Sequence, residues 1–562
     1  MTSTPAPPLS PTRKAVHRSI AALTAVAVAA VARPALVITL LAAAAVLGIA
    51  ALLWRFRPSA RLRRRIGTEG WLDVREYRAT PGAAVVRGGR RRPGLPARPV
   101  SAAGARVGRL VSGPAILRRR PVYTPWKRGV LVLGPQGSGK SSLLVGPIRE
   151  CPGPAYVTST KTELVDMTAT DRAQLGPVHV FNPTGLGSVA STLRWDPVAG
   201  CVDPATADAR ARALVRGGGG ATGTQNADFW AAKASEILRC YLLAAALEGH
   251  GMGQVMAWAL HPQDRTPAGL LSQYGTSVPS GWLGTLEQNL AAAPNTRSGY
   301  FAALAPAVAF MDNPTVAAAC RPGAGEGFDL AAYLRSPGAL YVIAGEGDQR
   351  IAPLLTALTE AVFSTAKQVA ALNPGSQLDP PLGLFLDEIA NITPVPLDNW
   401  AADSRGWGIT VWAVAQDLAQ LETRWGRPRA HTIFANLPTR IVLPGVAARE
   451  DLEHLAYLAG HRTVVQTSEG RSDNGDGRCT RSRNQSKARE PVVTGHTIYG
   501  LPRWHAYVLG LGTKPAIVRF EPGWRRRRRR LIPAPPVRRP VETQRVAPAT
   551  LTAVPDPVED AA

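Results

Sequence analysis

Short apolar runs alternate with stretches of helical periodicity over much of the chain between residues 129 and 520. Each run is four or five residues long, the length of a buried strand, and the runs lie at 130–133, 155–158, 177–181, 339–343, 382–386, 410–414 and 440–443. Strands that alternate with helices are typical of a parallel α/β sheet. Two later runs, 507–511 and 516–518, predict a hairpin that closes the domain.

The pattern changes between residues 203 and 320, where Ala- and Leu-rich segments have helical spacing, as in 229–238. We therefore expect an all-helical domain at 203–320, inserted into an α/β domain that comprises residues 129–202 and 321–520. Residues 466–489 are polar and rich in Ser, Arg and Gly, which predicts a mobile loop.

The N-terminal region is apolar. Residues 1–18 are rich in Pro, Ser and Thr and are predicted to be disordered. Residues 34–54 carry no charge over 21 residues, enough to span a bilayer core of ~30 Å at ~1.5 Å per residue. A shorter uncharged run precedes them, so residues 19–54 predict a membrane anchor of one or two spans. The arginines that follow from Arg55 place the rest of the chain in the cytoplasm.

The net charge of +25 lies outside the α/β domain. The basic juxtamembrane region 55–128 carries +17 and residues 519–545 carry +8, including six consecutive arginines, 525–530. Residues 521–562 are predicted to form a disordered Arg- and Pro-rich tail. Such basic flanks favour anionic lipid or nucleic acid as partners, although a solvated tail without a partner is also consistent with them. The scattered cysteines and histidines show no metal-ligand spacing and no disulfide framework.

The strongest motif is Gly-Pro-Gln-Gly-Ser-Gly-Lys-Ser at 134–141, between the predicted strand 130–133 and a predicted helix. Such a loop wraps backbone N–H groups around phosphate oxygens, and the helix N-terminus favours their negative charge. Lys140 is expected to reach the β- and γ-phosphates and Ser141 to ligate Mg²⁺. The predicted nucleotide-binding residues are Gly134, Gly137, Ser138, Gly139, Lys140, Ser141 and Ser142.

A second motif completes this chemistry. The apolar strand 382–386 ends in Asp387 and Glu388. An Asp at such a strand end holds Mg²⁺, and a Glu beside it can orient and deprotonate the attacking water. Together with the phosphate loop, this pair predicts a Mg-ATP hydrolase with ATP and Mg²⁺ as cofactors.

Further residues are candidates for roles in hydrolysis. Gln416 follows the strand 410–414, which we expect beside the strand that carries Asp387, so it can sense the γ-phosphate or orient the water. The alternative is that Asp417 caps the next helix and Gln416 has no role. Ring ATPases often use an arginine from the neighbouring subunit, and the candidates here are Arg405, Arg424 and Arg440.

The order of these motifs resembles the TraG/TraD/VirD4 family of type IV secretion coupling proteins. Besides the membrane anchor, the phosphate loop and Leu386-Asp387-Glu388, the resemblance rests on 160–164, Phe181-Asn182-Pro183, Phe229-Trp230, 405–409, Gln416, 420–422 and Trp425-Gly426. It covers roughly residues 125–520. One departure is that Ser159-Thr160 stand where the family has an acidic residue before Lys161.

The resemblance implies a RecA-like motor with a parallel central sheet and an all-helical inserted domain, anchored in the cell membrane as a homo-hexamer. It implies ATP-driven delivery of single-stranded DNA, with its bound relaxase, to the channel proteins of a type IV secretion system. The ATPase domain is then cytoplasmic.

Three other functions remain open from the sequence. The chain can be a double-stranded DNA translocase of the FtsK/SpoIIIE type, which shares the motor and the membrane anchor. It can be a secretion ATPase that moves protein. It can also be a membrane scaffold that binds ATP as a switch, although Glu388 argues against this because a switch needs no catalytic base.

Overall fold

The computed structural model describes residues 57–80, 83, 100–219, 226–345, 349–473 and 479–525, together with Thr39, 41–47 and Ile49. The chain divides into two compact units, 1–67 and 68–562. In the first unit, helix α3 (Pro58–Ile66) has arginines at 63–65 in its last turn. None of the helices formed by described residues is long and apolar enough to cross a membrane. Most of the predicted anchor 19–54, the predicted disordered segment 1–18, and residues 526–562 of the predicted disordered tail 521–562 lie outside the described residues. The start of that tail is ordered, because residues 523–525 form a 3-10 helix.

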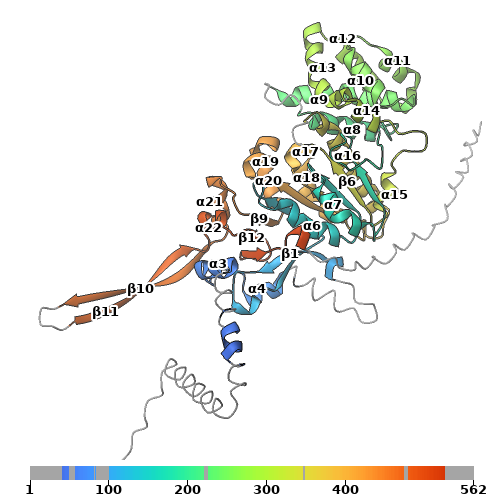
Figure 1. Cartoon of the computed structure of the whole chain (residues 1–562). Coiled ribbons are helices and arrows are strands. Elements are labelled where there is room, and N and C mark those ends of the chain that lie inside the picture. Colours follow the sequence, from blue (N-terminus) through green and yellow to red (C-terminus); the bar gives the residue numbers. More distant parts are fainter. Residues whose placement is uncertain are drawn as a thin grey trace, which may run out of the picture. The chain divides into compact units, whose positions relative to one another are not determined.

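A single mixed sheet forms the centre of the second unit (Figure 1). Its strand order is β2-β1-β13-β12-β9-β3-β8-β7-β4-β6-β5. From β9 to β5 neighbouring strands are parallel, whereas β12, β13, β1 and β2 extend the sheet in antiparallel fashion. The parallel strands are β3 (Val130–Leu133), β4 (Ala155–Ser159), β5 (Val178–Phe181), β6 (Ala339–Ile343), β7 (Leu382–Leu386), β8 (Ile409–Ala415) and β9 (Thr439–Val442).

The strand predictions are confirmed, because every apolar run from 130–133 to 440–443 lies on a strand within one or two residues. Every residue of β3, β4, β6, β7 and β8 is buried, as expected for strands covered on both faces. In the core, Phe385 on β7 lies 6.0 Å from Trp412 on β8 between ring centroids. The apolar runs therefore encode the interior of the sheet.

Helices connect the parallel strands. They are α6 (Lys140–Glu150), α7 (Glu163–Arg172), η5 (Gln349–Ile351), α16 (Ala352–Ala371), α17 (Ile389–Ile392), α18 (Leu397–Asp403), η6 (Ser404–Trp407), α19 (Leu418–Trp425) and α20 (Arg427–Asn436). Two further helices, α21 (Arg449–Tyr457) and α22 (Gly495–Tyr499), lie between β9 and the antiparallel strand β12. The carboxyl ends of parallel strands meet at one edge of a sheet, which is where such folds place ligands.

One buried arginine holds several of these connections together. Arg172, at the end of α7, is fully buried, and its guanidinium donates to backbone carbonyls on the chain before β4 and before β6. The oxygens of Gly153 and Pro337 lie 2.6 Å from its nitrogen, and that of Gly338 lies 2.7 Å away. Because the carbonyls disperse its charge, the cation is stabilised without a carboxylate partner.

Between β5 and β6 the described residues form helices and one isolated bridge, Arg194 to Gly327. The helices are α8 (Pro204–Gly217), α9 (Ala227–Leu247), α10 (Met252–Leu260), α11 (Thr266–Gln273), η3 (Gly275–Ser277), α12 (Trp282–Ala291), α13 (Pro294–Val308), η4 (Ala309–Asp312), α14 (Pro314–Ala319) and α15 (Leu330–Leu334). This agrees with the helical periodicity of 203–320. β5 and β6 still pair directly, so the helices do not interrupt the sheet.

The antiparallel part joins two distant segments of sequence. The predicted closing hairpin is confirmed as β12 (His505–Leu509) and β13 (Ala516–Arg519), followed by η7 (Gly523–Arg525). The basic region contributes β1 (Gly104–Leu110) and β2 (Pro121–Pro125), with α4 (Val74–Ala79), η1 (Val100–Ala102) and η2 (Ala115–Leu117). β1 pairs with β13, so this region belongs to the same sheet as the parallel strands.

The prediction of a mobile loop at 466–489 is wrong. β10 (His461–Asp473) and β11 (Cys479–Pro491) pair antiparallel over 13 residues each and form a sheet of their own (Figure 1). The hairpin is stabilised by cross-strand contacts such as the ion pair Arg462–Glu490, and Val465 is 52% exposed. None of the hairpin side chains whose exposure the structure describes is buried, so these positions need no apolar alternation, and a polar sequence does not distinguish the strands from a loop.

Candidate functional site

The phosphate loop lies between β3 and α6, as predicted. The backbone N–H of Gly134 donates to the carbonyl of Ala415 at 3.2 Å, which fixes the start of the loop against β8. The Ser138 hydroxyl donates to the Pro135 carbonyl at 2.7 Å. Gly139 has φ of 99°, a left-handed conformation that other residues rarely adopt, and it precedes the first residue of α6. The loop backbone is therefore held in shape by its own hydrogen bonds and by its glycines.

Lys140 and Glu388 form a buried ion pair at the centre of the site. The Lys140 Nζ lies 2.9 Å from Glu388 Oε1 and donates to the Gly134 carbonyl at 2.9 Å. Only 8% of the Lys140 side chain and 11% of the Glu388 side chain are exposed. The residues predicted as phosphate ligand and general base are thus in direct contact, although they are far apart in sequence.

Glu388 is held in an uncommon backbone conformation. Its φ of 48° and ψ of 44° lie in the left-handed region, which is rare for a residue with a side chain. The Asn391 amide donates to the second carboxylate oxygen of Glu388 at 3.4 Å. Backbone strain of this kind is concentrated at functional sites, where the surrounding structure enforces it.

Asp387 carries the features of a Mg²⁺ ligand. Its side chain is buried, its Oδ2 accepts from the Ser141 hydroxyl at 3.4 Å, and its Oδ1 is buried with no hydrogen-bond partner. Burial, reinforced by the neighbouring Glu388, raises the pKa of Asp387 to about 6. An orphaned carboxylate oxygen beside a hydroxyl fits a hard cation such as Mg²⁺, which is commonly bound by one or two carboxylates and by substrate phosphates.

Gln416 lies between the two motifs. It directly follows β8, which pairs with β3 on one side and with β7 on the other. This confirms the predicted neighbourhood of the strand. The backbone N–H of Gln416 donates to the Gln420 side chain at 2.9 Å, and its own side chain is half-buried. Asp417 caps α19 by accepting from the Gln420 N–H at 2.8 Å, so the helix cap of the alternative interpretation is present, and the role of Gln416 stays a prediction.

The other predicted residues lie around this centre. Ser142 is buried in the first turn of α6. Lys161 and Glu163 are exposed at the carboxyl end of β4, the strand next to β7. In the place of the acidic residue that the family has, the Ser159 hydroxyl accepts from the Lys161 N–H at 3.2 Å.

The three candidate arginines have different surroundings. The Arg440 guanidinium donates twice to the Phe434 carbonyl and lies over the Phe434 ring. Arg424 donates to the Arg216 carbonyl at 2.9 Å, and burial lowers its pKa. Arg405 is exposed. Arg424 and Arg440 thus bind carbonyls of their own chain, whereas Arg405 faces solvent.

Sequence reasoning missed an aromatic cluster beside the phosphate loop. A Cβ added to Gly139 would lie 3.1 Å from the ring of Trp504 and 3.6 Å from that of Phe520. These aromatic residues flank the last antiparallel strands, β12 and β13, more than 360 positions after the loop. No local motif signals that they return to it.

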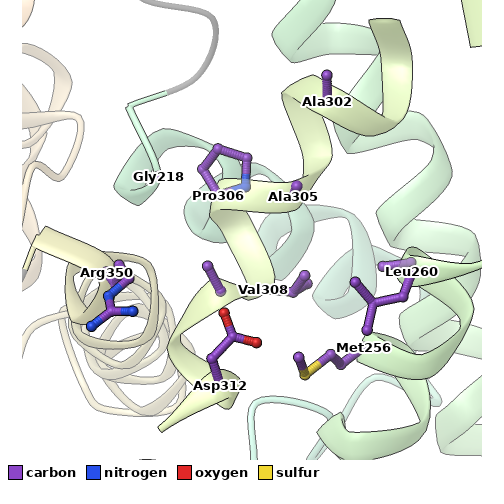
Figure 2. A pocket seen from close by; sticks show the side chains of 11 residues that line it. Gly218, Met256, Leu260, Ala302, Ala305, Pro306, Val308, Asp312 and Arg350 are labelled. Atoms are coloured by element: carbon purple, nitrogen blue, oxygen red, sulfur yellow. The ribbon is translucent and has the colours of Figure 1, made fainter. Parts of the chain in front are cut away.

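A separate cavity of about 480 Å³ lies among the inserted helices (Figure 2). Its walls are mainly apolar side chains of α10 and α13, with Asp312 and Arg350 as charged groups. None of the predicted nucleotide-site residues lines it.

Comparison with known proteins agrees with this fold. A family model described as the TraM recognition site of TraD and TraG matches residues 381–503, which include Asp387, Glu388 and Gln416. The resemblance to the coupling-protein family is confirmed. No curated protein shows significant similarity to the chain.

Solved structures of coupling proteins resemble the chain as well. The unbound monoclinic form of the bacterial conjugative coupling protein TrwBdeltaN70 is 22% identical, with a TM-score of 0.53, and the match covers 71% of this chain and 87% of that one. The plasmid coupling protein TrwB in complex with ADP and Mg²⁺ is 21% identical, with a TM-score of 0.52 and coverage of 74% and 89%. At this identity the likeness establishes the fold, a mixed α/β fold with a largely parallel central sheet.

Proposed function

We propose that the chain is a membrane-anchored ATPase that delivers DNA, with its bound relaxase, to a type IV secretion channel. The observation that carries the proposal is the buried Lys140–Glu388 pair beside Ser141 and Asp387, built on a coupling-protein fold. Solved structures of TrwB hold ADP with Mg²⁺ and a non-hydrolysable GTP analogue, which supports a nucleoside triphosphate at the same loop here.

The roles of the residues follow from their positions. Backbone N–H groups of the phosphate loop and the N-terminus of α6 bind the phosphate oxygens. Lys140 stabilises charge on the β- and γ-phosphates, and for this it exchanges its contact with Glu388 for the phosphate. Glu388 is then released to accept a proton from the attacking water, while Gln416, next to both, orients that water.

Ser141 and Asp387 are the residues that would hold Mg²⁺, which offsets phosphate charge when bound. The raised pKa of Asp387 means that the carboxyl must lose its proton to serve as a ligand, and at cytoplasmic pH it does so. The chain thus contributes one hydroxyl and one carboxylate, leaving the remaining positions to phosphates and water.

The flanks of the motor supply membrane and DNA contacts in this proposal. The uncharged run within 19–54 is long enough for a membrane span, and arginines follow it directly. Residues 55–128 have a net charge of +17 and residues 519–545 a net charge of +8, which favours binding to anionic lipid and to DNA phosphates. The nearly neutral motor then needs few contacts with the DNA that it moves, as in a homo-hexamer that encloses a strand.

ATP hydrolysis by the full chain in detergent, with and without single- and double-stranded DNA, tests the proposal. We expect turnover that single-stranded DNA stimulates and that both Lys140→Ala and Glu388→Gln abolish. Preference for double-stranded DNA would instead indicate a chromosome-type translocase, and indifference to DNA a protein-secretion ATPase. Nucleotide binding without turnover would indicate a membrane scaffold that binds ATP as a switch.

A further inference from the structure

An aromatic cluster adjoins the phosphate loop on the side away from Asp387 and Glu388. Trp504 precedes β12, Phe520 follows β13, and Trp524 lies in η7. Both contacts of Trp504 are edge-to-face, with ring centroids 5.8 Å from Phe520 and 5.2 Å from Trp524. The cluster therefore consists of residues from both ends of the closing hairpin and the segment after it.

The cluster is fixed against the loop itself. The ring of Trp504 approaches Gly139 so closely that a Cβ there would lie 3.1 Å from it. η7 packs against α6, where a Cβ added to Gly523 would lie 2.8 Å from the Val145 side chain. The aromatic rings thus lie beside the last glycine of the loop and the start of α6.

Two features of the cluster exceed what packing requires. Trp504 adopts φ of 65°, a strained backbone conformation for a bulky residue. Its carbonyl accepts from the Phe520 N–H at 3.0 Å, which holds the strained residue in place. The indole of Trp524 is 62% exposed, and the exposed Arg503 has its guanidinium 4.7 Å from the centre of the Trp504 ring. A strained tryptophan and an exposed one next to a ligand loop indicate a ligand contact.

The strand order shows which end of a nucleotide faces the cluster. On one side of β3 lie β8 and β7, which carry Gln416, Asp387 and Glu388, the groups suited to the γ-phosphate and Mg²⁺. On the other side lie β9, β12 and β13, and the aromatic cluster lies directly before β12 and after β13. A triphosphate whose γ-phosphate points toward Glu388 directs its nucleoside end toward the cluster.

We infer that Trp504 and Trp524, with Arg503, bind the base of the nucleotide by stacking. The inference rests on the proposed function, because it extends the same site. Every nucleobase has a π-face, so aromatic rings and a guanidinium bind it with little discrimination among bases. The cluster itself offers rings and one guanidinium rather than a set of hydrogen-bonding groups for a base edge. ATP and GTP should therefore bind with similar affinity.

Calorimetric binding of ATP, GTP and inorganic tripolyphosphate to the full chain tests this inference. Trp524→Ala should weaken ATP and GTP by roughly 5- to 150-fold, the worth of one stacked base, and leave tripolyphosphate within about twofold. Trp524→Phe should restore most of the affinity, because it keeps an aromatic face. Tyr457→Ala, which removes another exposed aromatic side chain, is the matched control and should change nothing.

If Trp524→Ala weakened the binding of tripolyphosphate as much as that of ATP, the inference would be overturned, because the substitution would then have damaged the phosphate loop. Unchanged affinity for all three would overturn it as well. If the unaltered chain binds neither ATP nor tripolyphosphate, the proposed function fails, and the base site fails with it. The tripolyphosphate measurement thereby distinguishes the two failures.

Discussion

Replacing Glu388 by glutamine changes the charge of the buried pair that holds Lys140 while nearly preserving its shape. In the structure, the Lys140 Nζ lies 2.9 Å from the Glu388 carboxylate, and both side chains are almost fully buried. A phosphate that binds Lys140 competes with this carboxylate for the same ammonium. The Glu388→Gln variant should therefore bind ATP more tightly even as it loses hydrolysis.

The size of the effect follows from the strength of the contact. A hydrogen bond to a charged group contributes about 1.5–3 kcal/mol. The ion pair with the Glu388 carboxylate belongs at the upper end of this range, and the bond that the neutral glutamine amide would accept from the Lys140 ammonium belongs at the lower end. The weaker contact in Glu388→Gln should lower the cost of releasing Lys140 by about 1–1.5 kcal/mol, or roughly 5- to 13-fold in Kd. Removing a negative charge next to the triphosphate acts in the same direction. Loss of the general base should lower kcat by about 10²- to 10⁴-fold.

Equilibrium binding of ATP by calorimetry, paired with steady-state hydrolysis, measures both effects. Lys140→Ala should lose binding and hydrolysis together. Glu453→Gln, which removes the charge of an exposed carboxylate paired with Arg449, should change neither and serves as the control. Unchanged or weaker ATP binding by Glu388→Gln would refute the competition between Glu388 and phosphate for Lys140.

Three other changes test separate parts of the site and fold. The raised pKa of Asp387 means that the carboxyl binds its proton more tightly in the native protein than in the unfolded chain, so its contribution to the free energy of unfolding falls as pH rises from about 4 to about 6 and stays low at higher pH. Asp387→Asn should therefore raise the free energy of unfolding at pH 8 without nucleotide by at most about 3 kcal/mol, which a higher melting temperature would show. A lower melting temperature would contradict this. Arg172→Met leaves several buried carbonyls without their donor and should cost about 3–5 kcal/mol in urea unfolding, whereas the exposed Arg335→Met should cost little. Gln416→Ala should reduce kcat by about 10- to 100-fold with the Kd for ATP within about twofold, because a residue that orients water acts in the transition state; a matching loss of ATP affinity would show instead that Gln416 supports the loop.

The local parts of this architecture could be read from sequence because each is encoded within a few residues. A buried parallel strand is a short apolar run, and the run before Lys140 and the run before Asp387 were identified on that basis. The phosphate loop needs glycines at fixed spacing, and Gly139 adopts the left-handed conformation that this spacing implies. Such signals require no knowledge of what lies across the sheet.

The contacts that sequence did not predict join segments that are distant along the chain. Trp504 reaches Gly139 only because β12 and β13 extend the sheet beyond β9. The hairpin of β10 and β11 was not predicted for another reason: the two strands form a separate sheet, and their polar sequence lacks the apolar alternation by which strands are recognised. The burial of Arg172 among carbonyls likewise depends on where β4 and β6 meet.

The inserted helices connect to the nucleotide site at a definite place. Because β5 and β6 pair directly, with Phe181 opposite Val342, the insertion leaves the sheet and its carboxyl edge intact. α8 packs against α16, and Arg216 at the end of α8 forms an ion pair with Glu360 of α16. The carbonyl of Arg216 also accepts from Arg424 of α19, the helix that begins two residues after Gln416. A rearrangement at the end of β8 on ATP hydrolysis would therefore reach the helical insertion through α19 and Arg424.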